Sequence, residues 1–267
     1  MPLLVSQPPT PEVLAACASL DQALASLEEA ILSLPSSPYE ADVEAVSLFT
    51  LVIRHVQGVL AMARSDFSLI PPANTSARVA FETSVRAAWM VNADDPFVRE
   101  ARWLAHLQEA ESANRRASIR SSSPKSAALF LKEAESIQQF REAVSGVMPK
   151  RVPLLMSVPK LPEMIASIGG ENLYSLYIYL SQYAHGGHMA TDLYRRHLGT
   201  QKTFGDFASP NHWYITLRLC WLSISHPANV VLSRIQHASA IYPAAEQEEE
   251  TVGAIEAVAI NSSEAPH

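Results

Sequence analysis

The sequence predicts an all-α fold, a multi-helix bundle of about seven or eight helices with a kinked C-terminal helix. Glycine is scarce, with 9 among 267 residues, while 48% of the residues are hydrophobic, so the chain can bury a core without glycine-rich loops. Apolar residues recur at three- and four-residue steps, which is the spacing of amphipathic helices. Prolines cluster between these segments, where they end one helix or begin the next.

We expect a single helical domain over residues 11–243. A proline-rich lead-in, 1–10, precedes it and is expected to be mobile. Residues 244–267 contain six glutamates and no lysine or arginine, so they are expected to form a disordered acidic tail. The formal net charge is −7, and without the tail it is −1. A nearly neutral body argues against an extensive nucleic-acid surface.

The first half of the chain predicts five long helices, and its helix-start signals support them. The expected ranges are 11–34, 39–65, 75–92, 95–120 and 125–146. Pro11 suits the first turn of the first helix, and Asp95-Pro96 combines a capping side chain with a first-turn proline. The second helix is apolar on most sides, which is typical of a helix at the centre of a bundle.

The second half is less regular. Four prolines between 149 and 162 forbid a continuous helix there and predict a surface loop that leads to a short helix, 162–168. A tyrosine-rich helix is expected over 171–185, between two glycine pairs. The last helix is expected over 210–241, where Pro227 should kink it or divide it.

The tyrosine-rich helix carries an unusual polar stripe. At 100° per residue Tyr174, Ser181 and His185 share one side, with Tyr177 beside them. The segment is otherwise apolar enough to be buried, and buried polar groups need partners. Another segment must therefore face this stripe.

The helix at 75–92 carries a charged pair on an apolar face. Arg78 and Glu82 are one turn apart and share that face with Trp89. Two interpretations remain open. The residues can form an intrahelical ion pair that fixes helix packing, or they can form the charged floor of a polar pocket.

Two patterns near His185 suggest chemistry, and both lack a necessary part. His185, His188 and Asp192 have metal-ligand spacing only if the helix is continuous, and Gly186-Gly187 argues against that. A Ser181–His185–Glu82 hydrolase would lack an evident oxyanion hole. In the alternative interpretation, Ser181 bonds a backbone carbonyl and His185 caps the helix end. We therefore predict no metal site and no cofactor.

Taken together, these motifs resemble a family of uncharacterised all-helical bacterial domains. The resemblance rests on the Arg78-x-x-x-Glu82 helix and on the later Tyr177-x-x-Leu-Ser181-x-x-x-His185 helix, and it spans about residues 40–240. It implies a helical bundle in which a polar pocket is formed by Arg78, Glu82, Tyr174, Tyr177, Ser181 and His185. It implies no known reaction. We expect a ligand-binding or interaction module, in bacterial stress or defence systems.

Some domains of this kind are reminiscent of HEPN ribonucleases, which carry an Arg and a His separated by four to six residues. Arg99 and His106 fit that spacing. In a metal-independent ribonuclease the histidine would do acid–base work and the arginine would bind the scissile phosphate. This ribonuclease is our alternative hypothesis, so whether the chain is an enzyme stays open.

Composition also bears on location and partners. The N-terminus lacks a basic segment followed by an apolar run, and the clean apolar runs are far shorter than a bilayer span. Cys17 and Cys220 fall in helical patterns and offer neither metal spacing nor a disulfide framework. We expect a cytoplasmic protein without a membrane span. Its partners are unknown, and a homodimer is left open.

Overall fold

The fold is known from a computed structural model that describes residues 6–155, 157–170, 173–196, 203–204, 208–236, 242 and 244–260. The helices of these residues are α1 (Pro11–Leu32), α2 (Glu40–Ser65), η1 (Phe67–Leu69), α3 (Ile70–Val91), α4 (Pro96–Arg120), α5 (Pro124–Val147), α6 (Leu161–Ser167), α7 (Tyr174–Ala184), α8 (His188–Thr191), α9 (Pro210–Ile224), α10 (His226–Gln236) and α11 (Ala245–Ile260). Two-residue strands β1 (Arg195–Arg196) and β2 (Thr203–Phe204) pair antiparallel. The predicted all-α, multi-helix class is confirmed.

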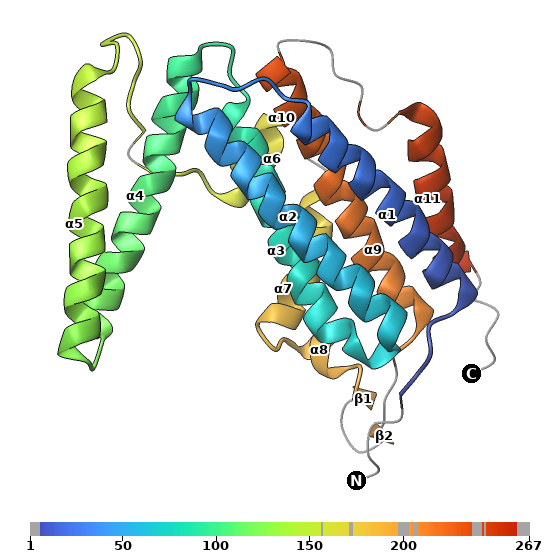
Figure 1. The fold of residues 1–267 in the computed structure, drawn as a ribbon. Coiled ribbons are helices and arrows are strands. Elements are labelled where there is room, and N and C mark those ends of the chain that lie inside the picture. Colours follow the sequence, from blue (N-terminus) through green and yellow to red (C-terminus); the bar gives the residue numbers. More distant parts are fainter. Residues whose placement is uncertain are drawn as a thin grey trace.

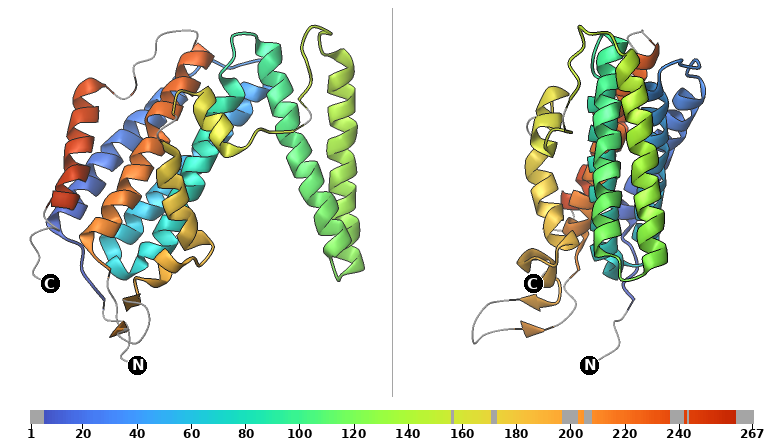
Figure 2. Two further views of the ribbon diagram at one scale, coloured as in Figure 1. Left: turned by 180° about the vertical axis from the view of Figure 1, so that it is seen from behind. Right: turned by 90° about the vertical axis from the view of Figure 1, so that its left-hand side faces the viewer.

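The molecule consists of a helical body and a projecting arm. In the body, α3 packs against α2, α9, α7, α10 and α6, while α1 packs against α11 and α2. The arm is the α4–α5 hairpin, which extends away from the body (Figures 1 and 2). Its attachment is at the N-terminal part of α4, where Trp103 and Leu104 are buried with the main core.

The helix boundaries follow the caps that the sequence carries. Thr10 accepts a bond from the backbone N–H of Val13, and Asp95 accepts one from Phe97. Proline occupies the first turn of α1, α4, α5 and α9, where its missing N–H costs nothing. These side chains explain why the predicted starts of α1, α4 and α5 lie within one residue of the observed ones.

The predicted start of α3 was wrong by five residues. The expected range begins at residue 75, whereas α3 begins at Ile70 and Pro71 and Pro72 lie in its first turn. The physical reason is that the first backbone N–H groups of a helix have no intrahelical acceptor, so two consecutive prolines are tolerated there.

The described part of the lead-in, residues 6–10, is hydrogen-bonded to the turn that follows α2. The backbone N–H of Gln7 donates to Asp66 Oδ1 at 3.0 Å, and the Gln7 carbonyl accepts from Phe67 at 2.9 Å. Hydrogen bonds that the backbone N–H groups of Ser68 and Gln7 donate to Asp66 lower the pKa of its carboxyl group to about 2. Residues 1–5 lie outside the described residues.

The expected disordered tail contains a helix instead. α11 packs against α1 and α9, and its Thr251, Ile255 and Val258 are buried. These three residues recur at steps of four and three, so one side of an otherwise acidic segment is apolar enough to dock. The glutamates make the segment acidic on average, and most of them come before Thr251, so composition alone does not reveal its apolar side. Residues 261–267 lie outside the described residues.

The predicted kink near the C-terminus is a break between two helices. α9 ends at Ile224, the following Ser225 has a non-helical φ of −96° and ψ of −93°, and α10 begins at His226. Pro227 has no N–H to continue the α9 hydrogen-bond pattern. The predicted end of this region, at 241, falls outside the described residues.

One described helix, α2, is long and apolar enough to cross a membrane by length and composition alone. It is also a core helix, in which Phe49, Val56 and Leu60 are buried against the rest of the body. A buried core helix passes the same test, so this is weak evidence for a membrane span.

Candidate functional site

Arg78 joins α3 to the end of α7. Its Nε donates to Glu82 Oε1 at 2.9 Å, its Nη2 donates to the Tyr177 hydroxyl at 3.0 Å, and its Nη1 lies 3.1 Å from His185 Nε2. Since a guanidinium only donates, His185 Nε2 is the acceptor in this contact. One guanidinium therefore holds side chains from two helices about 100 residues apart in sequence.

Aromatic rings complete this Arg78 cluster. The Arg78 guanidinium carbon lies 5.1 Å from the centroid of the Tyr177 ring, and Tyr174 stacks on Tyr177 with 5.7 Å between centroids. Burial is the largest effect on the pKa of Arg78 and lowers it, but the charge of Glu82 and the hydrogen bonds that Arg78 donates to Tyr177 and Glu82 more than offset it, so the pKa is raised. Arg78 therefore stays charged.

The structure brings together five of the six residues of the predicted pocket. Ser181 Oγ donates to the Tyr177 carbonyl at 2.9 Å, as in the alternative interpretation, so this donor is used within α7. The Arg78 cluster is also less buried than its apolar surroundings predicted: the side chains of Arg78 and Glu82 are 15% and 36% exposed, and His185 is exposed. The cluster lies at the surface, within reach of a ligand.

His185, His188 and Asp192 have the spacing of metal ligands, but they do not lie on one continuous helix. Gly186 has a φ of +63° and ends the α7 segment, so His188 begins a separate helix. In the described part of the chain, no group of three or more His, Cys, Asp or Glu side chains is arranged to hold a metal ion. The start of the predicted helix, residues 171–172, lies outside the described residues.

The alternative nuclease pair is not available as predicted. Arg99 is 1% exposed, and its Nη1 donates to Asp42 Oδ1 at 2.9 Å in a buried ion pair. A phosphate on the surface cannot reach this guanidinium. Arg99 instead fastens α4 to α2, and sequence spacing alone does not distinguish this role from phosphate binding.

A second polar cluster lies where α3 meets α4. Arg86 Nη1 contacts Glu109 Oε2 and lies 3.4 Å from His106 Nδ1. The other imidazole nitrogen of His106 is 3.6 Å from Glu44 on α2, and His106 is the main reason that the pKa of Glu44 is lowered. Among the described residues, no hydrogen bond or ion pair of Arg86 involves Nε or Nη2.

Sequence reasoning missed Arg86, although a signal was present. Arg78, Glu82 and Arg86 follow one another at four-residue steps, so they form one stripe along α3, here called the α3 stripe. Each of its arginines contacts a carboxylate and a histidine, His185 of the α7 segment for Arg78 and His106 of α4 for Arg86. The two arginines are about 12 Å apart along the helix axis, from eight residues at 1.5 Å each.

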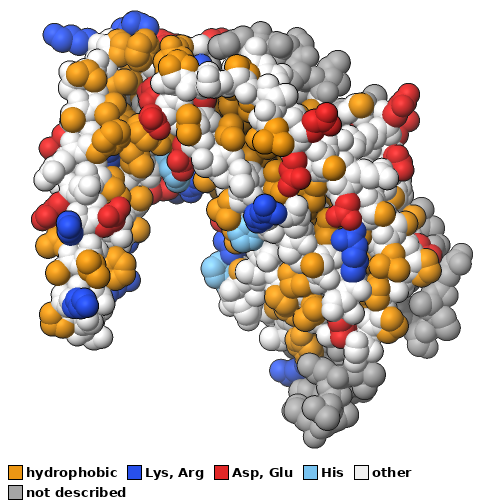
Figure 3. Space-filling view, in the orientation of Figure 1, with side chains coloured by type: hydrophobic (Ala, Val, Ile, Leu, Met, Phe, Trp, Pro, Cys, Tyr) orange, Lys and Arg blue, Asp and Glu red, His pale blue; other side chains and the backbone are white. Residues whose placement is uncertain are grey.

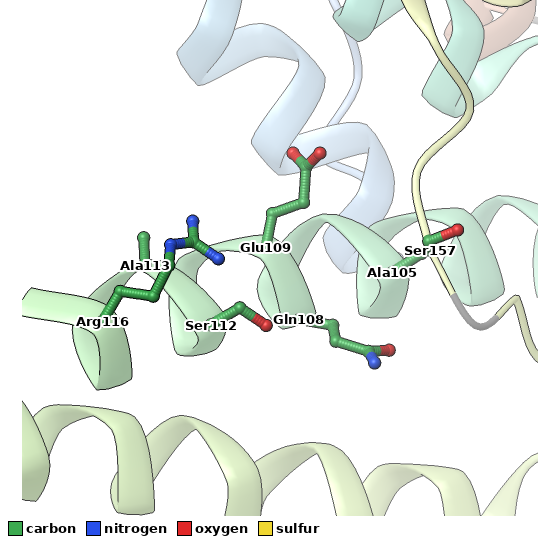
Figure 4. A pocket seen from close by; sticks show the side chains of 7 residues that line it. All are labelled: Ala105, Gln108, Glu109, Ser112, Ala113, Arg116 and Ser157. Carbon is green, nitrogen blue, oxygen red and sulfur yellow. The ribbon is translucent and has the colours of Figure 1, made fainter. Parts of the chain in front are cut away.

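An open pocket of about 430 Å³ adjoins the Arg86 cluster. It is lined by Ala105, Gln108, Glu109, Ser112, Ala113, Arg116 and Ser157. Glu109 and Arg116 extend from the same side of α4, and Ser157 approaches from the segment before α6 (Figure 4). No carboxylate within the described ranges forms an ion pair with Arg116. The pocket thus combines an unpaired cation with the Glu109 that holds Arg86.

Comparison with known proteins gives a family but no activity. Residues 43–204 match the model of a family of unknown function, DUF5677, and this range runs from α2 to β2. It therefore includes the whole α3 stripe, both of its histidines and the arm. No curated protein and no solved structure matches the chain. The chain belongs to the DUF5677 family, a family of unknown function.

Proposed function

We propose that the chain is a ligand-binding module that takes up a small anionic molecule, carrying a phosphate or carboxylate group, along the α3 stripe. Arg86 and Arg116 bind the anionic group, and the Arg78 cluster of Arg78, Glu82, Tyr174, Tyr177 and His185 holds the rest of the ligand. The observation that carries the proposal is Arg86, a partly exposed guanidinium that Glu109 and His106 orient through one nitrogen only.

Guanidinium geometry supports an anion as the ligand. The Nε–Nη2 edge of arginine presents two parallel N–H groups that match the two oxygens of a carboxylate or phosphate. In Arg86 this edge has no partner among the described residues, and in Arg78 the same edge is occupied by Glu82. The two arginines therefore differ in role: Arg78 orients the side chains of its cluster, and Arg86 binds the anionic group of the ligand.

The surroundings suit a small molecule better than a polymer. A pocket of about 430 Å³ lies within the range of ligand sites in proteins. Between the arm and the body the surface is hollowed and carries histidine and charged side chains (Figure 3). Glu44, Glu82 and Glu109 alternate with the arginines, so the cluster does not form the continuous basic track that a nucleic-acid backbone needs.

The cellular setting stays a prediction. Free cysteines, both buried, are typical of proteins in reducing compartments, which supports the expected bacterial cytoplasm. A role in stress or defence rests on the resemblance to uncharacterised bacterial domains.

Calorimetric titration with inorganic phosphate tests the proposal. We expect the wild-type chain to bind phosphate with a dissociation constant at or below about 1 mM. Arg86→Gln should weaken binding at least about tenfold, because a hydrogen bond to a charged group contributes about 1.5–3 kcal/mol. Arg54→Gln is the matched control, since Arg54 is an exposed arginine of α2 that contacts Gln57. Equal affinities for the wild type and both variants would refute the proposed site.

A further inference from the structure

A second pocket adjoins the pocket at the Arg86 cluster. It lies between α4 and α5, has a volume of about 380 Å³ and shares Gln108 and Ser112 of α4 with the first pocket. Its other lining residues are also polar: Glu111, Gln138, Arg141, Glu142 and Ser145. Among the described residues that line the two pockets, none is aromatic, and none has an aliphatic side chain larger than that of alanine. A ligand that fills both pockets must therefore be polar over most of its surface.

Arg141, the one cation among the described residues that line the second pocket, is occupied within the protein. Its Nε donates to the Leu104 carbonyl at 3.0 Å, while Nη1 donates to Glu111 Oε2 and Nη2 to Gln108 Oε1, both at 2.7 Å. An anionic group in this pocket would meet the carboxylates of Glu111 and Glu142 without a free guanidinium to bind it. The part of a ligand that lies here is therefore polar but not anionic.

Uncharged hydrogen-bonding groups remain available where the two pockets meet. Since a guanidinium only donates, Arg141 binds the amide oxygen of Gln108 and leaves its Nε2 as a donor. In α2, α7 and α9, serine hydroxyls donate to the carbonyl four residues earlier and are occupied there. The hydroxyls of Ser112, Ser145 and Ser157, by contrast, form no hydrogen bond within the described part of the chain. Each of them can donate one hydrogen bond and accept others.

We infer that the ligand of the α3 stripe is a phosphorylated polyol of the size of a pentose or hexose phosphate. This inference rests on the proposed function, in which Arg86 and Arg116 bind the phosphate and the Arg78 cluster contacts the ligand from the body. The arm contributes the contacts to the hydroxyl groups, through Gln108 and Ser112. These two residues are one turn apart, about 6 Å along α4, so hydroxyl groups on different carbons of one sugar can reach both. A sugar hydroxyl donates and accepts, so it can pair with the serine hydroxyl and with the amide donor.

A nucleotide fits these pockets less well than a sugar phosphate. The flat faces of a nucleobase are bound mainly by stacking on aromatic side chains. The described residues that line the two pockets provide no ring for that contact. In the Arg78 cluster, the Tyr177 ring already contacts the Arg78 guanidinium and the Tyr174 ring. A sugar, whose hydroxyl groups cover most of its surface, instead meets amide and hydroxyl groups that can bind it.

Calorimetric titration of the full chain with different phosphate compounds tests the inference. We expect glucose 6-phosphate and ribose 5-phosphate to bind at least about tenfold more tightly than ethyl phosphate, because each added neutral hydrogen bond strengthens binding about two- to tenfold. If ethyl phosphate binds and neither sugar phosphate binds more tightly, the polyol is excluded while the anion site stands. If inorganic phosphate and ethyl phosphate also fail to bind, the proposed function is refuted, and this inference with it.

A serine variant locates the hydroxyl contacts. Ser112→Ala should reduce the preference for glucose 6-phosphate over ethyl phosphate about two- to tenfold, because one hydrogen bond to the sugar is lost. Ser136→Ala is the matched control, since Ser136 is an exposed serine of α5 that lines neither pocket, and it should leave the preference as in the wild type. An unchanged preference in Ser112→Ala, or an equal reduction in both variants, would overturn the placement of the sugar against α4.

Discussion

Replacing Arg99 with alanine is expected to lower the free energy of unfolding by about 3–5 kcal/mol, because Asp42 is then left as a buried, unpaired charge. The two side chains are 1% and 5% exposed, and their atoms are 2.9 Å apart. The pair fastens the base of the arm to α2. The Tyr39 ring centroid lies 5.7 Å from the Arg99 guanidinium, so the alanine variant also loses a cation–π contact.

Two further variants separate the ion pair from other losses. Arg99→Met/Asp42→Leu should recover most of the lost stability, since removing both buried charges also removes their desolvation cost. Arg64→Ala breaks a half-exposed pair with Asp21 and should change the unfolding free energy by about 0–1 kcal/mol. Urea unfolding followed by circular dichroism measures all three. A loss below about 1 kcal/mol for Arg99→Ala would mean that the arm is not fastened by this pair.

Deleting residues 244–267 should lower the free energy of unfolding by at least about 3 kcal/mol. The deletion removes Ile255 and Val258, which are both 1% exposed, and full burial of one such side chain contributes about 1.5–3 kcal/mol. It also opens the surface of α1 and α9 that α11 covers. Tyr242, whose hydroxyl donates to the Ala23 carbonyl, stays in the shortened chain.

Point variants of α11 assign this loss to packing. Ile255→Ala should cost about 2–5 kcal/mol, as for large-to-small changes in a core. Glu249→Gln changes an exposed residue of the same helix and should have almost no effect. If the shortened chain unfolded at the same temperature as the full chain in a thermal scan, α11 would not be docked in solution.

The sequence predicted those elements whose signals are local. The predicted helix starts at 11, 95 and 125 lie within one residue of the observed ones, because caps and first-turn prolines act within one turn. The resemblance and the polar stripe also predict that Arg78, Tyr177 and His185 lie close together. In the structure Arg78 contacts both of the other residues, and their joint role as a pocket stays a prediction.

Features that depend on a partner far along the chain were missed. The residues near Arg99 in the sequence do not indicate that it forms a buried ion pair with Asp42, which lies 57 residues earlier. The buried side of α11 consists of three residues in an acidic segment, and it can be recognised as a packing surface only once α1 is known to lie beside it. The free donors of Arg86 were missed for the same reason. They can be identified only when it is known that His106 and Glu109 both contact its Nη1.

The most direct test of the proposed site is a nuclear magnetic resonance titration that follows the arginine Nε–Hε signals while inorganic phosphate is added. Arg86 Nε has no partner in the described structure, so its signal should move in a saturable way, with Arg78 responding more weakly through the α3 stripe. Arg54 should move only as an exposed side chain responds to ionic strength. If the Arg86 signal does not move, or moves no more than that of Arg54, anion binding at the α3 stripe is contradicted.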